Sequence, residues 1–139
     1  MFRPRAKNKS WSVEDSAFIA QICLLLRLVM SLKKKFAKES FTIMNELVLP
    51  NDTNTLNNLM GGRLLHWMDI AAAISAQKHC NRIVVTASVD NVSFKQPIKL
   101  GDVITIEAKV TRAFNTSVEV RLDVWSENIP SGSRQKSNE

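Results

Sequence analysis

The segment that decides the fold is Asn57–Gln77, with the sequence NNLMGGRLLHWMDIAAAISAQ. Alanine, leucine and methionine dominate this segment, and these residues have high helix propensity. We therefore expect one long helix over about Met60–Lys78. The helix begins at the glycine pair Gly61 and Gly62 and carries one carboxylate, Asp69, among apolar neighbours.

Asp69 shares its face of the predicted helix with small and apolar side chains, because residues three, four and seven positions apart lie on one side. These neighbours are Leu65, Ala72, Ala73 and Ala76. We expect a sheet to cover this face, and burial of an unpaired carboxylate costs several kcal/mol. Two interpretations stay open. Asp69 either lies solvated at the edge of the stripe or paired with His66, or it has a chemical role.

The glycine pair at the start of the helix gives weak support to a chemical role. Gly61 and Gly62 leave backbone N–H groups open to a ligand atom, and a helix N-terminus favours negative charge. Glycines also begin helices for packing reasons alone.

Strand patterns flank the predicted helix on both sides. FTIMNELVLP, residues 41–50, is typical of a strand closed by a proline. RIVVTASVDNVSF, residues 82–94, is mostly apolar and is expected to be covered on both faces. Residues 104–111 and 118–125 alternate apolar and polar side chains, with a hairpin turn at 112–117. The order predicts an α+β fold in which an antiparallel sheet packs against one helix.

Composition and charge exclude several classes of protein. A chain of 139 residues with 45% hydrophobic content suits one domain. Its two cysteines are too few for a disulfide framework and lack zinc-site spacing, so we expect a reducing, cytoplasmic compartment. Residues 1–40 hold nine Lys/Arg and three Asp/Glu, and residues 41–139 hold ten of each. The basic excess therefore belongs to the N-terminal segment, and we expect no nucleic-acid partner.

The N-terminal segment contains the apolar run Ala17–Met30 and a following lysine cluster. The run has 14 residues with Gln21 and Arg27 inside it, whereas a membrane span needs about 20 apolar residues. Acidic residues before the run also argue against a secretory signal. An amphipathic helix that docks on the domain or on a membrane surface is one interpretation. The other takes Met30 as the native start, with residues 1–29 an extension without a role in the chemistry and residues 30–139 the domain.

Three stretches together strongly resemble the hotdog-fold acyl-coenzyme A thioesterases, in the branch of brain-type and small bacterial acyl-CoA hydrolases. They are LVLPNDTNTLNNLMGGRLLHWMDIAAAISAQKH, VVTASVDNVSFKQPIKLGDVITIEAKV and NTSVEVRLDVWSEN. The resemblance covers about residues 40–136 and includes the motifs P-x-D-x-N, GG, MD and F-x-x-P-I-x-x-G-D. It implies a sheet wrapped around one central helix, a homodimer or a multiple of dimers such as a hexamer, and active sites between protomers.

The resemblance also implies roles for two side chains and a difference at each end of the chain. Asp69 is implied to be the catalytic carboxylate, and Asn58 its partner from the opposite protomer. The chain stops at SGSRQKSNE, where relatives continue into a final strand, so we expect that strand to be missing and the domain to be C-terminally truncated. The N-terminal extension, 1–29, has no counterpart.

The chemistry of these residues fits hydrolysis of a fatty acyl-CoA to a fatty acid and coenzyme A. An N–H of Gly61 or Gly62 can stabilise the oxyanion, and one such donor is typically worth about 3 kcal/mol. Asp69 can activate water as a general base or attack the carbonyl itself. Asn58 can orient the water or the carboxylate, although paired asparagines also suit a plain turn. Candidates for the nucleotide phosphates are Lys95, Arg112, Arg134 and Lys136.

Other chemistries have little support in the sequence. His66, His79 and Cys80 lack metal-ligand spacing, and no G-x-S-x-G nucleophile motif is present. We expect no metal and no cofactor besides the coenzyme A of the substrate. The alternatives are a hotdog module that binds acyl-CoA without hydrolysing it, and a protein that associates with a membrane surface through its N-terminus. Membrane association is not expected.

Overall fold

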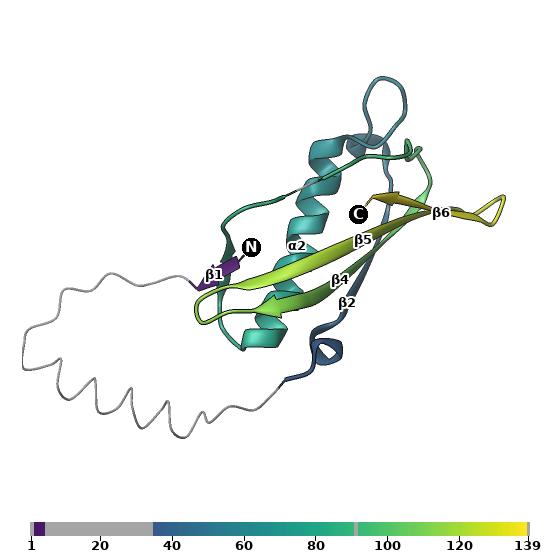
Figure 1. Ribbon diagram of the computed structural model, residues 1–139. Coiled ribbons are helices and arrows are strands. Elements are labelled where there is room, and N and C mark those ends of the chain that lie inside the picture. The colour runs from purple at the N-terminus through teal and green to yellow at the C-terminus, as the bar shows by residue number, and fades with distance from the viewer. Residues whose placement is uncertain (1, 5–34, 91, 139) are drawn as a thin grey trace, which may run out of the picture. The chain divides into compact units, whose positions relative to one another are not determined.

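The computed structural model describes residues 2–4, 35–90 and 92–138 (Figure 1). Apart from Lys35 and Phe36, these residues belong to one compact unit. The apolar run Ala17–Met30 lies outside the described residues. The interpretations of that run as an amphipathic helix or as part of an extension therefore stay predictions, as does the domain boundary at residue 30.

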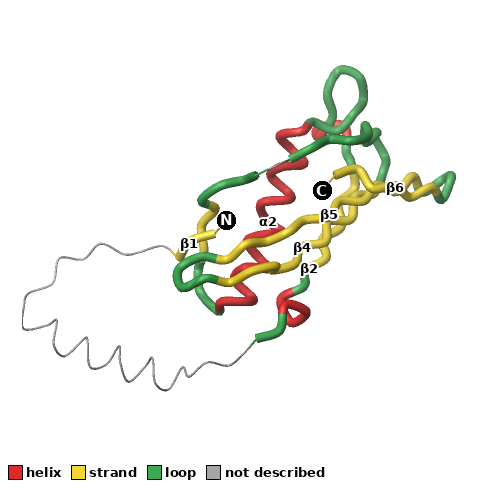
Figure 2. Tube along the Cα trace, viewed as in Figure 1, coloured by secondary structure: helices red, strands yellow, loops and turns green. Residues whose placement is uncertain are grey.

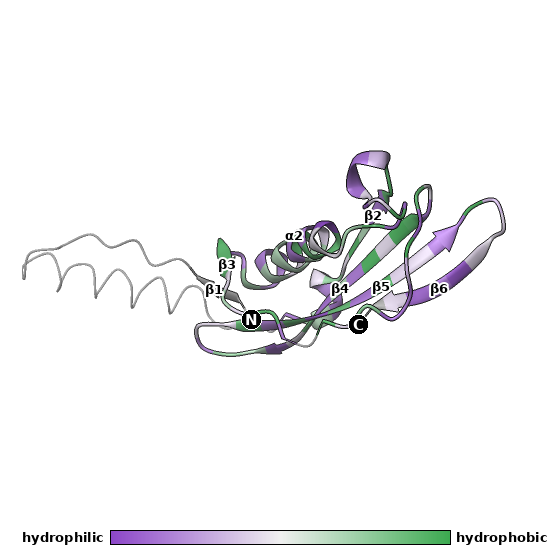
Figure 3. Cartoon of the chain, turned by 90° about the horizontal axis from the view of Figure 1, so that it is seen from above, coloured by the Kyte–Doolittle hydropathy of each residue, from purple (hydrophilic) through white to green (hydrophobic). Residues whose placement is uncertain are grey.

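One long helix and an antiparallel sheet make up the fold, as the sequence predicts (Figures 1 and 2). The sheet order is β2-β4-β5-β1-β3, and β6 pairs with β5. In Figure 3 the helix α2 lies along one side of the sheet. The elements are β1 (Phe2–Pro4), the 3-10 helix η1 (Ala37–Ser40), β2 (Thr42–Leu47), the 3-10 helix η2 (Pro50–Asp52), α2 (Gly61–Cys80), β3 (Val84–Thr86), β4 (Val103–Ala113), β5 (Val118–Asn128) and β6 (Ser133–Asn138).

The alternation predicted in β4 and β5 sets the two faces of the sheet. Ile106 of β4 lies opposite Met44 of β2 and Val124 of β5, so apolar side chains line up across three strands. On the inner face Ile104, Ile106, Ala108 and Val110 are all buried. The turn at residues 114–117 joins β4 and β5 as a hairpin, which confirms the prediction.

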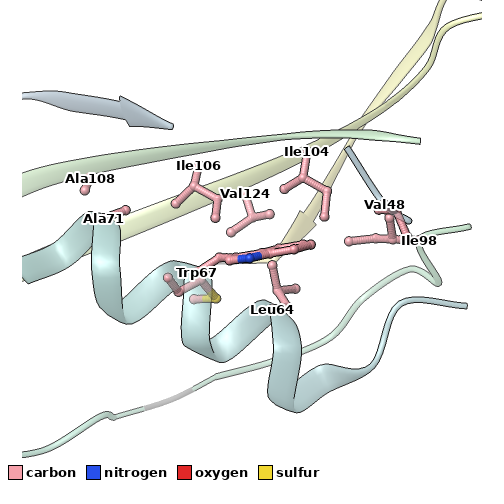
Figure 4. Close-up of a cluster of buried hydrophobic side chains, with 10 residues drawn as sticks. Val48, Leu64, Trp67, Ala71, Ile98, Ile104, Ile106, Ala108 and Val124 are labelled. Carbon is pink, nitrogen blue, oxygen red and sulfur yellow. The ribbon is translucent and has the colours of Figure 1, made fainter. Parts of the chain in front are cut away.

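The core forms where one stripe of α2 packs against this inner face (Figure 4). The Trp67 ring lies between the helix and the strands, near Ile104 and Val124. The helix contributes Leu64, Trp67, Met68 and Ala71 to the cluster. A second cluster with Ala72, Ala76, Val84 and Val118 continues the stripe towards the helix C-terminus.

The strand expected over residues 82–94 is shorter than predicted. Only Val84–Thr86 form β3, and Ile83, Val85 and Val89 are 74%, 44% and 61% exposed. The expectation of cover on both faces is therefore wrong for this chain alone. The apolar pattern indicated burial, but no described segment of the same chain covers these side chains.

Both ends of the described chain add strands that the sequence analysis did not expect. Ser133–Asn138 form β6 against residues 124–128 of β5, and the expected truncation of the domain at its C-terminus stays a prediction. The hydroxyls of Ser126 and Ser137 lie 2.7 Å apart in the interior beneath this pairing. At the other end β1 pairs with β3 and, through Phe2, with Val118 of β5.

Replacement of a core side chain tests this packing. Ile104 is fully buried, so we expect Ile104→Ala to lower the free energy of unfolding by about 2–5 kcal/mol, because the cavity forfeits contacts as well as transfer energy. The measurement is the urea midpoint. Ile129→Ala is the control, since Ile129 is 57% exposed after β5 and should change stability by no more than about 0.5 kcal/mol. Equal losses in the two variants would contradict the assigned core.

Candidate active site

The segment before α2 is fixed by one buried carboxylate, Asp52. Its Oδ1 accepts a hydrogen bond from Arg63 Nε at 2.7 Å, and its Oδ2 accepts one from the Leu49 N–H at 3.1 Å. Its backbone carbonyl accepts the Met60 N–H at 2.9 Å. Asp52 therefore holds the strand end, the loop and the first turn of the helix in one arrangement.

The start of α2 exposes backbone donors. Met60 is the N-cap and provides no side-chain cap. The first helical N–H groups with an acceptor are those of Arg63 and Leu64, which donate to the Met60 carbonyl at 3.0 and 3.1 Å. Within the part of the chain that the structure describes, the N–H groups of Gly61 and Gly62 have no protein acceptor. The predicted role of these two glycines as oxyanion donors is compatible with this geometry and stays a prediction.

Asp69 lies at the edge of the buried stripe of α2. Its side chain is exposed, while Ala72 and Ala76 beside it are buried. The expectation that a sheet covers this carboxylate is therefore wrong for the single chain, because Asp69 stays exposed although β3 contacts it. The Thr86 hydroxyl of β3 donates a hydrogen bond to Asp69 Oδ1.

Thr86 is a residue that the sequence analysis missed. It lies well beyond Asp69 in the sequence, in a stretch where threonine reads as an ordinary strand residue. β1 runs beside it, with Phe2 opposite Thr86 in the register. Only the tertiary pairing of α2 with β3 shows that this hydroxyl serves the carboxylate.

Asn54 and Asn58 of the loop have different surroundings. The Asn54 side-chain oxygen accepts the N–H groups of Leu56 at 2.9 Å and Asn58 at 3.2 Å. Asn58 is half-buried, and its backbone joins the loop to Lys99 in an isolated bridge. Asn57 between them adopts a left-handed conformation with φ of 56°. The loop is therefore an ordered turn that leads directly into the helix start.

The structure does not bring Asp69 together with the helix start of its own chain. Gly62 precedes Asp69 by seven positions, which is a rise of about 10.5 Å. The first-turn N–H groups point along the axis away from Asp69. A carbonyl oxygen bound at Gly62 therefore lies on the far side of the helix end from this carboxylate.

The cationic candidates for phosphate binding separate into two places. Arg134 and Lys136 flank Trp125, with Arg134 Cζ 5.0 Å and Lys136 Nζ 6.0 Å from the ring centroid. Arg134 also lies 3.6 Å from Glu107, and Lys136 lies 2.8 Å from Asp123. These carboxylates already balance the two charges.

Lys95 lies near this pair and Arg112 does not. The Lys95 backbone N–H donates to the Ser137 carbonyl at 3.0 Å, which places it beside β6. Arg112 lies opposite Glu119, at the other end of β5 from Trp125. Six positions along the strand separate Glu119 from Trp125, or about 20 Å.

The described part of the chain offers neither a metal cluster nor a membrane-spanning helix. Among residues 2–4, 35–90 and 92–138, no group of three or more His, Cys, Asp or Glu side chains is placed to hold a metal ion. In the same ranges no helix is both long and apolar enough to cross a bilayer. The expected absence of a metal and of a cofactor stays a prediction.

Comparison with known proteins identifies relatives of this chain. A sequence model of the thioesterase superfamily matches residues 56–133. The uncharacterized acyl-CoA thioester hydrolase YkhA of Bacillus subtilis is 42% identical over 101 residues, which are 73% of this chain and 59% of YkhA. The chain thus spans about three fifths of the length of that relative.

Solved structures of similar chains share the fold. An apo-hexameric acyl-CoA thioesterase is 42% identical, with a TM-score of 0.73 over 75% of this chain and 67% of the other. The acyl-CoA hydrolase of Staphylococcus aureus, solved with butyryl coenzyme A, coenzyme A and coenzyme A disulfide, is 36% identical, with a TM-score of 0.71 over 75% and 63% of the two chains.

The Staphylococcus aureus enzyme has also been solved as three alanine variants, of an asparagine, an aspartate and a threonine. Along that enzyme the asparagine comes first, the aspartate second and the threonine third. The superfamily match covers more than half of the present chain. With one helix packed along an antiparallel sheet, the chain belongs to the thioesterase superfamily and has its hotdog fold.

Proposed function

We propose that this protein hydrolyses fatty acyl-CoA to the free acid and coenzyme A. The observation that carries the proposal is the exposed Asp69 carboxylate held by the Thr86 hydroxyl, in a chain of the thioesterase superfamily. Relatives named as acyl-CoA thioester hydrolases support the substrate class. A cytoplasmic location belongs to the proposal as well and is supported by the cysteine usage.

Asp69 acts on the thioester through its free oxygen. Thr86 donates to Oδ1, which leaves Oδ2 to take a proton from water or to attack the carbonyl carbon. Attack by water or by Asp69 forms a tetrahedral oxyanion, and its collapse breaks the C–S bond. On the second route water then hydrolyses the mixed anhydride and frees the Asp69 carboxylate. The products are the carboxylic acid and the coenzyme A thiolate, which takes up the proton.

The partner amide is Asn54 or Asn58. Asn58 is the candidate from the sequence. The sequence separation between Asn54 and Asp69 equals that between the asparagine and the aspartate replaced in the Staphylococcus aureus enzyme. The separation between Asp69 and Thr86 likewise equals that between the aspartate and the threonine replaced there. The spacing supports Asn54 as the amide that acts with Asp69 and Thr86.

The site combines two copies of the chain. Because the first-turn N–H groups of α2 point away from Asp69, the oxyanion donors at Gly61 and Gly62 serve the Asp69 of a partner. Exposed apolar side chains on and beside α2 provide a surface for that partner, and they are Ile70, Ile74, Ile83, Val85 and Val89. The assembly is a homodimer or a multiple of dimers. Similar thioesterases that were solved as hexamers support an assembly of several dimers.

The coenzyme A end of the substrate binds to cations of the assembly. The candidates in or beside β6 are Lys95, Arg134 and Lys136. A nucleotide phosphate that binds there takes the place of the Glu107 and Asp123 carboxylates as the ion-pair partner of Arg134 and Lys136. Arg112 is remote within one chain, so its contribution requires a neighbouring copy.

Loss of the carboxylate tests the proposed role of Asp69. We expect Asp69→Asn to keep the fold and to lower kcat by about 10²–10⁴, because the amide neither accepts the proton nor attacks. The measurement is thiol release from an acyl-CoA under saturating substrate, with circular dichroism as the fold control. Near-normal turnover in this variant would assign Asp69 to the solvated helix edge instead.

Replacement of the hydroxyl tests the Thr86 contact. Thr86→Val keeps the shape of the side chain and removes the donor, so we expect kcat to fall by about 10-fold to 100-fold, as for a hydrogen bond to a charged group. Thr86→Ser is the matched control because it retains the hydroxyl, and it should keep most of the activity. Similar losses in both variants would mean that packing at β3 matters and the hydrogen bond does not.

Subunit mixing tests the shared site and decides between the two asparagines. Asp69→Asn is mixed separately with Asn54→Ala and with Asn58→Ala under conditions that allow exchange. If the second residue acts in the partner's site, half of the randomly formed dimers contain one intact site, and activity returns to about a quarter of wild type. The asparagine whose variant is inactive alone and recovers on mixing is the partner of Asp69. Exchange verified by a tag pull-down without recovery in either mixture would refute the shared site.

A further inference from the structure

We propose that Phe94 forms the wall of the site against which the acyl group of the substrate lies, and that Gly61 is a glycine in order to seat this ring. The inference rests on the proposed hydrolysis and adds to it a residue that determines acyl specificity. Nothing in the chemistry of the Asp69 carboxylate requires an aromatic residue at position 94.

The contact between Phe94 and the helix start is close. A Cβ added to Gly61 would lie 3.3 Å from Phe94 Cζ, 3.5 Å from Cε2 and 3.9 Å from Cε1. The end of the ring therefore rests on the Gly61 backbone at the first residue of α2. Gly62, the next residue, meets nothing within 4 Å in the same test. The two glycines thus have different surroundings.

The need for glycine at position 61 comes from this contact and not from the backbone conformation. The glycines with positive φ among the described residues are Gly101 and Gly132. An alanine at Gly61 would be compatible with the helical backbone but would press against the ring, which would have to move by a few tenths of an ångström.

The segment that follows Phe94 is anchored at two points. The N–H of Lys95 donates to the Ser137 carbonyl of β6 at 3.0 Å. Farther along, the Ile98 carbonyl accepts the Leu59 N–H at 2.8 Å. One anchor is the sheet and the other is the loop that precedes α2. The ring is therefore held beside the helix start.

The exposure of Phe94 separates it from the core. The residue is 53% exposed, and neither apolar cluster of the core includes it. A large aromatic surface left open next to unpaired N–H groups has two physical effects on a thioester bound there. It excludes water from one side of the oxyanion donors, which strengthens them, and it offers apolar contact along the acyl chain, of which a longer chain makes more. Met60, which precedes Gly61, is also exposed, at 40%.

The experiment measures kcat and KM of the full chain with butyryl-CoA and palmitoyl-CoA. We expect Phe94→Ala to change the ratio of kcat/KM between the two substrates by about tenfold, as for lost apolar contacts in a specificity pocket. Phe94→Leu keeps a smaller apolar wall and should give an intermediate ratio. A structural role alone would lower kcat/KM for both substrates by the same factor and leave the ratio unchanged.

The seating of the ring is tested by pairing each glycine change with Phe94→Leu. Gly61→Ala should lower kcat/KM, and the double variant Gly61→Ala/Phe94→Leu should recover part of the loss because the shorter side chain makes room. Gly62→Ala measures what an alanine at the helix start does by itself, and its effect should simply add to that of Phe94→Leu. Thermal unfolding of every variant verifies the fold.

The outcomes separate this inference from the proposed function. A folded wild-type assembly that hydrolyses neither thioester overturns the proposed function, and the acyl wall with it. If the wild type is active and its ratio of kcat/KM between the two substrates is unchanged in both Phe94→Ala and Phe94→Leu, the proposed role of Phe94 as the acyl wall is overturned and the proposed hydrolysis is not. If the effect of Gly61→Ala simply adds to that of Phe94→Leu, as expected for Gly62→Ala, the proposed contact between Phe94 and Gly61 has no functional role.

Discussion

The packing of one stripe of α2 against the inner face of β4 and β5 is the constraint on which the rest of the structure depends. Trp67 fills the space between the layers, and Ala71, Ala72 and Ala76 allow close approach of the helix to the strands. Because this stripe fixes the rotation of the helix, it also fixes where every other residue of α2 points. Asp69 lies two positions after Trp67 and so falls at the border between core and solvent, where a carboxylate stays hydrated and still meets β3.

Local sequence signals were sufficient for the elements that the chain stabilises by itself. The helix over Gly61–Cys80 and the alternation in β4 and β5 follow from helix propensity and from period-two patterning, and both agree with the structure. The exposure of Val85 and Val89 could not be derived in this way, because an apolar strand pattern records burial without telling which chain provides it. Likewise the contact of the Thr86 hydroxyl with Asp69 depends on the packing of β3 beside α2, which the sequence pattern does not show.

The asparagine-rich loop shows why the candidate site was only partly predictable. Asn54 and Asn58 both suit turn chemistry, and in the structure the Asn54 oxygen does organise the turn, since it accepts two backbone N–H groups. From the sequence alone, a residue that holds a turn in this way cannot be told apart from one that has a chemical role as well. Its amide nitrogen is a separate group, however, so the same side chain can hold the loop with one atom and act on substrate or water with the other.

The division of the proposed site between two chains follows from the direction of a helix dipole. A helix offers its positive end and its unpaired N–H groups at the N-terminus, so one helix cannot direct them toward a carboxylate two turns farther along its own axis. A second copy removes this difficulty, because its helix start can face the Asp69 of the first. The same approach would cover the exposed Ile70 and Ile74 and remove water from the reacting carbonyl. Electrostatic stabilisation of the oxyanion is stronger in such a dry site than at an open helix end. In the proposed mechanism, cover for the apolar surface beside Asp69 and completion of the site come from the same event, the association of two chains.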